Sequence, residues 1–261
     1  MAFSLIWLPE VLQAAGLKVA TIEGWESRGR GNMGKVFGVI CHHTVGPKTG
    51  NMPSLHTLIN GRSDLPGPLA QLGLGRDGTY YVIAAGRCNH AGKGMWQGIT
   101  TGNSSFIGIE AENTGKDNDP WPQVQLDAYK QGVAAILNHI GQGSEFCAGH
   151  KEYALPKGRK PDPRFDMSAF RASVAAIMNG SMAPLTPIPA AEPPGSAGRL
   201  TLRRGATGAL VEQLQKKIGV NPTGNFGPVT EAAVRNFQRA KNLVPDGIVG
   251  PKTWAALDAV A

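Results

Sequence analysis

A proline-rich stretch near residue 190 divides this chain into two parts. The segment "SMAPLTPIPAAEPPGSAG", which begins at Ser181, contains five prolines and no stretch that resembles a core segment. Proline-rich spacers of this kind are extended and semi-rigid, at about 3 Å per residue. The pattern predicts one domain over residues 1–180, a linker over 181–197 and a second domain over 198–261, as the length of 261 residues allows.

Strand and helix patterns alternate in the first part. Apolar runs of strand length occupy residues 36–41 and 105–113, and residues 69–86 contain two such runs joined by an Asp-Gly turn at 77–78. Apolar residues recur at helical spacing over 124–140, and further helices are expected at 8–15 and 166–180. Interleaved strands and helices predict an α/β domain, with a mixed central β-sheet flanked by helices.

The second part contains an internal repeat. "PTGNFGPVTEAAV", from Pro222, returns as "PDGIVGPKTWAAL" from Pro245, an offset of 23 residues. In each copy a turn with glycine precedes a threonine, Thr230 or Thr253, that is expected to cap the next helix. With "GALVEQLQKKIG" in front, the pattern predicts a small three-helix domain. Its expected core consists of Leu210, Val211, Leu214, Ile218, Val234, Phe237, Leu243, Trp254 and Leu257.

Positive charge is concentrated in this second part. From Gly198 onwards nine Lys/Arg residues face four Asp/Glu residues, a surplus of five out of the chain's net charge of +7. A compact basic domain suggests a polyanionic partner, such as nucleic acid, an anionic wall polymer or a membrane surface. Specific nucleic-acid binding is not expected, because Phe226, Phe237 and Trp254 occupy core or turn positions rather than a stacking platform.

The sequence predicts no transmembrane segment and no secretory signal peptide. No apolar run approaches the roughly 18 residues that span a bilayer, and the N-terminal "MAFSLIWLPEVLQ" lacks a basic first region. The three cysteines, Cys41, Cys88 and Cys147, are too few and too scattered for a disulfide framework. We therefore expect reduced thiols.

Histidines and carboxylates form a candidate metal site. His42 ends an apolar strand, His150 follows the short apolar stretch "EFCAG", and Asp162 lies in the irregular loop beyond it. Two imidazoles and one carboxylate suit a catalytic zinc ion whose fourth position stays open to water. Either histidine alone would be read as structural, so the prediction depends on the combination.

A zinc hydrolase also needs a base and a cation that stabilises an oxyanion. "IGIEAE" offers Glu110, with Glu112 as an alternative base, and the loop offers Lys160 or Arg159. Spacing alone leaves a second interpretation open, in which the two glutamates form an exposed strand edge and 157–160 is merely a basic loop.

Four motifs resemble, in chain order, those of zinc-dependent N-acetylmuramoyl-L-alanine amidases: "VICHHT", "CNHAG", "IGIEAEN" and "GHKEYALPKGRKPDP". The resemblance covers about residues 30–180 and extends to phage lysins, wall-recycling amidases and peptidoglycan recognition proteins. It implies that the Zn²⁺ ligands are His42, His150 and Asp162, that Glu110 is the general base and that Lys160 stabilises the tetrahedral intermediate.

The resemblance also bears on the remaining residues of these motifs. It places the ligand at the first histidine of the pair 42–43, and only one of two adjacent strand residues can face the metal. His90, Asn89 and Arg87 are expected to line the groove for the peptide stem or muramic acid. Cys41 and Cys88 remain alternative zinc ligands.

The tail, over about residues 200–258, is similar to the repeat-built peptidoglycan-binding domain of wall hydrolases. Together the two resemblances imply a monomeric enzyme that cleaves the bond between N-acetylmuramic acid and L-alanine in bacterial peptidoglycan. A phage endolysin is the expected setting, held in the host cytoplasm until a separate pore-forming protein opens the membrane. The alternatives are a bacterial autolysin, a recycling amidase, or a recognition protein that binds the wall without cutting it.

Overall fold

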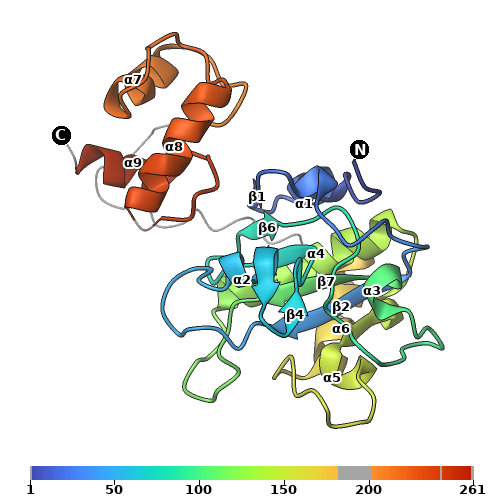
Figure 1. Cartoon of the computed structure of the whole chain (residues 1–261). Helices are drawn as coiled ribbons and strands as arrows, with labels where there is room; N and C mark the ends of the chain where they lie inside the picture. The colour runs from blue at the N-terminus through green and yellow to red at the C-terminus, as the bar shows by residue number, and fades with distance from the viewer. Residues whose placement is uncertain (1, 182–200, 242, 260–261) are drawn as a thin grey trace. The chain divides into compact units, whose positions relative to one another are not determined.

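The computed structural model describes residues 2–181, 201–241 and 243–259, which form two compact units (Figure 1). Each unit is described by itself. Apart from Ser181, the predicted linker 181–197 lies outside the described residues, so the division at 180 and 198 stays a prediction. In the described ranges no helix combines the length and the apolar character needed to cross a membrane.

A six-stranded sheet forms the centre of the first unit. Its strand order is β1-β6-β5-β7-β2-β8. The pairing of β5 with β6 is antiparallel, and the other four pairings are parallel. The predicted mixed sheet is therefore confirmed. The strands are β1 (Val19–Thr21), β2 (Gly38–His43), β5 (Leu72–Leu74), β6 (Tyr80–Val82), β7 (Phe106–Ala111) and β8 (Cys147–Gly149), with a separate hairpin of β3 (Gly61–Arg62) and β4 (Leu65–Pro66).

The antiparallel pair β5–β6 is the hairpin predicted from the Asp-Gly sequence. Gly78 has a φ of +79°, a left-handed conformation that glycine adopts without steric cost. The turn is closed by two backbone hydrogen bonds, from Gly75 N–H to the Thr79 carbonyl at 2.9 Å and from Gly78 N–H to the Gly75 carbonyl at 3.0 Å.

Two long helices, α4 (Gln123–His139) and α6 (Met167–Met178), pack against each other and against β2 and β8. The buried side chains of α4 include Tyr129, Val133 and Ile136, which share the helical spacing seen in the sequence. Asp166 caps α6, since its carboxylate accepts the N–H groups of Ser168 and Ala169 at 2.7 and 3.0 Å. The other helices are α1 (Leu8–Ala14), α2 (Leu55–Asn60), α3 (Gly102–Ser105), α5 (His150–Tyr153) and the 3₁₀ turns Trp25–Ser27 and Ser144–Phe146.

The alternation along β2 divides its side chains between two cores. Val39 and Cys41 belong to the large core beneath α4 and α6. Ile40 belongs to a smaller core on the other face of the sheet, with Phe106 and Tyr153. Since successive strand residues point to opposite faces, His42 shares the face of Ile40 and the next residue turns back toward the helices.

The second unit contains α7 (Ala209–Lys217), α8 (Pro228–Ala240) and α9 (Pro251–Asp258). The predicted three-helix arrangement is therefore present. Leu243 is only partly buried and lies outside its core, contrary to expectation, whereas Phe226 and Val249 from the repeated turns are fully buried. The core residues are Leu202, Val211, Leu214, Phe226, Val234, Val249, Trp254 and Leu257.

The repeated threonines do not cap helices, so that expectation is wrong. Helices α8 and α9 begin at prolines preceded by glycines that offer no side-chain cap. Inside the first turn, the Thr230 hydroxyl accepts a hydrogen bond from Gln215 Nε2 at 2.9 Å, and Thr253 accepts one from Gln238 Nε2 at 3.2 Å. A glutamine from the preceding helix therefore fixes each repeat.

Candidate metal centre

Three neighbouring parallel strands bring the predicted residues to one edge of the sheet. His42 lies near the end of β2, directly opposite Glu110 of β7, and His150 follows β8 immediately. The strands β7, β2 and β8 are adjacent in the sheet. Because the carboxyl ends of parallel strands meet at the same edge, where open α/β sheets place their sites, segments far apart in sequence converge here.

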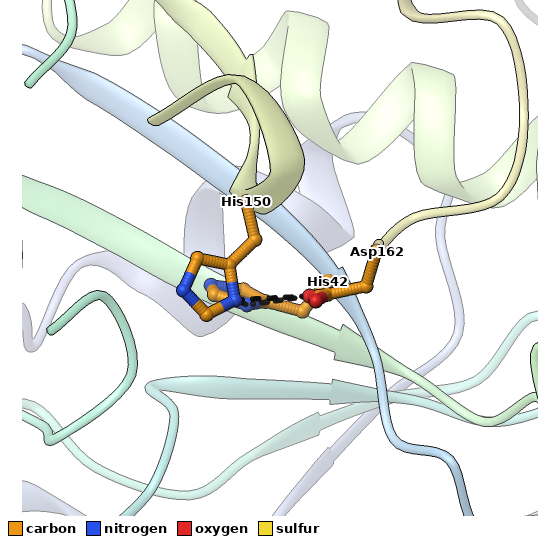
Figure 2. Close-up of side chains that lie close together, drawn as sticks. All are labelled: His42, His150 and Asp162. Carbon is orange, nitrogen blue, oxygen red and sulfur yellow. Dashed lines mark hydrogen bonds and ion pairs between the residues drawn. The ribbon is translucent and has the colours of Figure 1, made fainter. Parts of the chain in front are cut away.

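His42, His150 and Asp162 form a tight cluster of possible metal ligands (Figure 2). The Nδ1 atoms of the two histidines are 3.0 Å apart, and Asp162 Oδ2 lies 3.0 Å from His150 Nδ1 and 3.3 Å from His42 Nδ1. All three residues are buried. In the part of the chain that the structure describes, no other group of three such side chains converges in this way.

The loop that carries Asp162 is fastened to the helix that carries His150. Lys151 N–H donates to the Asp162 carbonyl at 2.6 Å. At the start of α5, Gly149 N–H donates to Glu152 Oε2 at 2.8 Å, and Arg171 of α6 binds both oxygens of Glu152 at 2.7 and 2.9 Å. Helix α6 thereby holds the turn between β8 and α5, from which the His150 side chain projects.

The electrostatics of the cluster favour metal ligands over a protonated histidine. Burial, with His150 beside it, lowers the pKa of His42 to about 4, so that its imidazole is neutral at neutral pH. The Asp162 carboxylate lies within 3.3 Å of the Nδ1 atoms of both histidines. The site therefore presents a neutral His42 imidazole beside a carboxylate.

This donor set fits zinc. Ligand atoms bound tetrahedrally at 2.0–2.1 Å lie about 3.3 Å from one another, close to the separations found here. His150 Nε2 donates to the Ala91 carbonyl at 3.0 Å, which leaves its Nδ1 lone pair facing the cluster. Two imidazole nitrogens and one carboxylate oxygen, with a fourth position left for water, are the ligands of a catalytic zinc site.

Glu110 and Glu112 differ sharply in their surroundings. Glu110 Oε1 lies 3.9 Å from His42 Nδ1, and within the described chain its Oε2 has no hydrogen-bond partner. Burial, and next the charge of Asp162, raise the pKa of Glu110 to about 8. The fully buried Glu112 accepts hydrogen bonds from the Thr44 hydroxyl at 2.8 Å and from Ser54 N–H and Oγ at 3.0 Å each. Glu112 therefore holds a loop, whereas Glu110 combines an unpartnered oxygen, within the described chain, with a pKa that lets it exchange a proton near neutral pH.

Of the two basic candidates in the loop, Lys160 is the one whose charge affects the pKa values of His42 and Glu110. Burial has the largest effect on both groups, since it lowers the pKa of His42 and raises that of Glu110, and the Lys160 charge lowers both pKa values to a smaller extent. Arg159 instead donates to the carbonyl of Leu155 at 2.9 Å and to that of Lys93 at 2.7 Å. Its guanidinium joins two loops of the backbone.

The other sequence candidates for metal ligands lie outside the cluster. His43 turns toward Trp121, with ring centroids 6.3 Å apart. Cys41 Sγ lies 3.6 Å from Cys147 Sγ, and the buried Cys88 donates to the Gly86 carbonyl. All three cysteines are free thiols. Because side chains alternate along β2, His42 points to the cluster, whereas its neighbours Cys41 and His43 point to the other face of the sheet.

The three predicted substrate-contacting residues separate into two groups. Arg87 and Asn89 line an open hollow of about 320 Å³, together with Asn103 and residues 100–102. His90 does not line it. The residue is only 7% exposed, and its ring lies behind His42, with Nδ1 3.1 Å from His42 Nε2. Both ring nitrogens of His90 have partners inside the protein, His42 Nε2 and the Phe106 carbonyl.

Sequence reasoning missed Tyr129, which it treated as an apolar position of α4. The Tyr129 hydroxyl accepts the His42 N–H at 2.9 Å and lies 2.9 Å from the Ile109 carbonyl, to which it can donate. It fixes the end of β2 next to the metal cluster. The available signal was a hydroxyl on an otherwise aliphatic helix face, since a buried tyrosine needs a polar partner.

Comparison with known families agrees with this site. Residues 32–165, just over half of the chain, match the N-acetylmuramoyl-L-alanine amidase family, and residues 206–257 match a putative peptidoglycan binding domain. The chain belongs to the N-acetylmuramoyl-L-alanine amidase family and carries a peptidoglycan-binding type of domain after it.

Individual relatives are similar over shorter stretches. The 1,6-anhydro-N-acetylmuramyl-L-alanine amidase AmpD of Enterobacter cloacae is 32% identical over 99 residues, 37% of this chain and 52% of that protein. The zinc D-Ala-D-Ala carboxypeptidase of Streptomyces albus G is 44% identical over 62 residues, 21% of this chain and 24% of the relative. The structure of the Escherichia coli amidase AmiD with its substrate shares 17% identity over 89% of this chain and 91% of that one, with a TM-score of 0.45. The chain thus spans between about a quarter and about half of the length of these curated relatives.

Proposed function

We propose that this protein is a zinc-dependent hydrolase of peptidoglycan, which cleaves the amide between N-acetylmuramic acid and the L-alanine of the stem peptide. The observation that carries the proposal is the convergence of His42, His150 and Asp162 at separations of 3.0–3.3 Å. Beside them lies the Glu110 carboxylate, one oxygen of which has no partner among the described residues. Membership of the amidase family supports the choice of bond.

Each residue of the site has a role in this reaction. A zinc ion held by His42, His150 and Asp162 would supply a Lewis acid that makes water nucleophilic at neutral pH. Glu110 takes the proton from the attacking water through Oε2 and returns it to the leaving amine of L-alanine. The ammonium group of Lys160 stabilises the negative charge that develops on the carbonyl oxygen.

Substrate placement is proposed from the hollow that Arg87 and Asn89 line. Arg87 supplies an exposed positive charge and Asn89 an amide at its rim, chemistry suited to a peptide carboxylate or to the hydroxyl and acetamido groups of a sugar. Since His90 is held behind His42, we do not include it among the substrate contacts.

The second unit is proposed to hold the enzyme on the wall. Its match to a peptidoglycan-binding domain and its excess of basic residues support a polymeric, anionic target. Tethering raises the local concentration of the catalytic unit at its substrate. An enzyme that acts on soluble fragments has no use for such an anchor, so we favour wall lysis, as by a phage endolysin released through a separate membrane pore, over wall recycling.

The test is a digest of purified sacculi by the full chain, analysed by mass spectrometry, with and without a chelator. Stem peptides that begin with L-alanine, lost on chelation and restored by zinc, are expected. New reducing sugar ends, or cuts within the peptide, would refute the proposed bond. Binding to sacculi without any cleavage would identify a recognition protein.

The same assay addresses the biological setting. We expect faster release of peptide from insoluble sacculi than from soluble muropeptides at equal substrate concentration. A preference for soluble fragments would favour a recycling enzyme and would contradict wall lysis as the function.

A further inference from the structure

Two consecutive residues lie directly behind the two histidines of the metal centre. We infer that His90 and Ala91 form one support that positions both metal histidines, with the His90 ring holding His42 and the Ala91 carbonyl holding His150. This inference rests on the proposed function, because it concerns the same metal centre. It assigns to the "NHAG" sequence a role in orienting ligands instead of a contact with substrate.

The His42 side of the support is a chain of two hydrogen bonds. His90 Nε2 lies 3.2 Å from the Phe106 carbonyl, which can only accept, so the proton of the neutral His90 ring is on Nε2. His90 Nδ1 is then an acceptor, and it lies 3.1 Å from His42 Nε2. His42 must therefore carry its proton on Nε2, which leaves the Nδ1 lone pair directed at the cluster.

The His150 side uses the backbone of the next residue. His150 Nε2 lies 3.0 Å from the Ala91 carbonyl and donates to it. His150 Nδ1 is thereby also left as a lone pair, 3.0 Å from Asp162 Oδ2. Both imidazoles are thus held in the same tautomer, and both bare nitrogens face the same point.

The support is itself held in place from two sides. Asn103 Oδ1 accepts the N–H groups of both His90 and Ala91, at 2.9 and 2.8 Å. On the sheet side the His90 ring lies against Gly108 of β7, where an added Cβ would fall 2.6 Å from His90 Cγ. A side-chain amide and a glycine therefore fix a two-residue segment that is almost wholly buried.

This arrangement differs from ordinary core packing in a testable way. A packing role requires only that position 90 be filled, whereas a positioning role requires an acceptor toward His42 and a donor toward Phe106. Glutamine offers both groups in one planar amide, and leucine fills space with neither. The pair His90→Gln and His90→Leu therefore separates the two roles.

The experiment measures zinc affinity of the full chain by competition with a chromogenic chelator, together with the thermal unfolding of the metal-free protein. We expect His90→Leu to bind zinc about 10- to 100-fold more weakly, the usual effect of removing a partner of a ligating histidine. His90→Gln is expected to restore most of the affinity. Circular dichroism at the assay temperature confirms that each variant is folded.

A second pair of variants tests the support without changing any ring. Asn103→Asp keeps an oxygen for the two N–H groups, whereas Asn103→Leu removes it. We expect only the leucine variant to lose zinc affinity, by about tenfold or more. Because this pair leaves His90 intact, it decides the question if His90→Leu proves unfolded.

The outcomes separate this inference from the function beneath it. If the unmodified chain binds zinc and His90→Leu binds it equally well, the inference is wrong and the proposed function stands. Equal losses in His90→Leu and His90→Gln, both folded, would show that an acceptor and a donor at position 90 do not account for the zinc affinity, and would also overturn the inference. An unmodified chain that binds no zinc would overturn both proposals.

Discussion

At the scale of single residues, the site assigns opposite roles to two glutamates of the same motif. Glu110 has an oxygen without a partner beside the metal cluster, within the described chain, whereas Glu112 has its oxygens occupied by Thr44 and Ser54. A sequence motif with two carboxylates two residues apart cannot tell which one is bound, because the partners of Glu112 are more than 50 residues away in the chain.

This contrast gives a prediction for a matched pair of variants. Glu110→Gln is expected to lower kcat by about 100- to 10,000-fold, the contribution of a general base, and to leave zinc binding in place. Glu112→Gln is expected to lower the free energy of unfolding by about 1–3 kcal/mol, because it weakens buried hydrogen bonds to a charged group. Amide hydrolysis and thermal unfolding, measured on both variants, check this.

The reverse pattern would contradict these roles. If Glu112→Gln lost more activity than Glu110→Gln well below its unfolding temperature, Glu112 would be the base and Glu110 a bystander. Assays at low temperature separate the loss of a catalytic group from a loss of folded enzyme.

At the scale of elements, helix α6 stabilises the metal centre from outside. Arg171 binds Glu152 through two hydrogen bonds and also donates to the Cys147 carbonyl at 3.1 Å. Glu152 in turn accepts the N–H of Gly149, the residue before His150. The helix therefore fixes the backbone next to His150, a proposed metal ligand, through the Arg171–Glu152 ion pair and the hydrogen bond from Gly149 to Glu152.

Arg171→Met is therefore expected to lower the free energy of unfolding by about 2 kcal/mol, since a partly buried carboxylate loses a charged partner. Zinc affinity is expected to fall with it, because the turn that carries His150 is no longer held. Chemical denaturation and zinc competition provide the two measurements.

Arg62→Met is the matched control. The Arg62–Asp64 pair has the same charges, but its side chains are 54% and 69% exposed. Surface pairs contribute about 0–1 kcal/mol, so the control should unfold almost like the unmodified chain. If both substitutions lowered the free energy of unfolding equally, Arg171 would have no stabilising role beyond that of a surface ion pair.

Comparison of sequence with structure shows which elements local patterns can determine. The strand β7, the helix α4 and the Asp-Gly hairpin follow from periodicity and turn chemistry, which are properties of neighbouring residues. The order of strands that brings β8 beside β2 is not local. The residue types alone suggested His42, His150 and Asp162 as one metal site, and the family resemblance supported that choice. The capping role of Thr230 was predicted wrongly because α8 begins two residues earlier, at Pro228, and the Thr230 hydroxyl is bound by Gln215 of the preceding helix. Leu243 was wrongly placed in the core, which Phe226 and Val249 help to fill instead.

At the scale of the whole molecule, the two units have separate cores, each complete among its own residues. In the second unit, Trp254 is the largest of the core side chains and is 1% exposed. A lesion in this core is therefore expected to abolish wall attachment while the metal centre remains intact.

Trp254→Ala tests this, since truncation of a buried tryptophan costs about 3–5 kcal/mol. We expect the full-length variant to bind sacculi poorly and to hydrolyse soluble muropeptides at the normal rate, with normal zinc content. Co-sedimentation with sacculi and a soluble-substrate assay give the two readouts. An equal loss on both substrates would mean that the units depend on each other.

The use of the Ala91 carbonyl to hold His150 has a consequence for mutational scanning. A main-chain oxygen is present whatever residue occupies the position, so no truncation at 91 deletes this hydrogen bond, and the Phe106 carbonyl behind His90 is protected in the same way. An alanine scan would therefore detect the contributions of His90 and Asn103, but it would not detect those of the Ala91 and Phe106 carbonyls. Part of what orients the proposed metal ligands is therefore backbone, which side-chain substitutions do not remove and which only a structure shows.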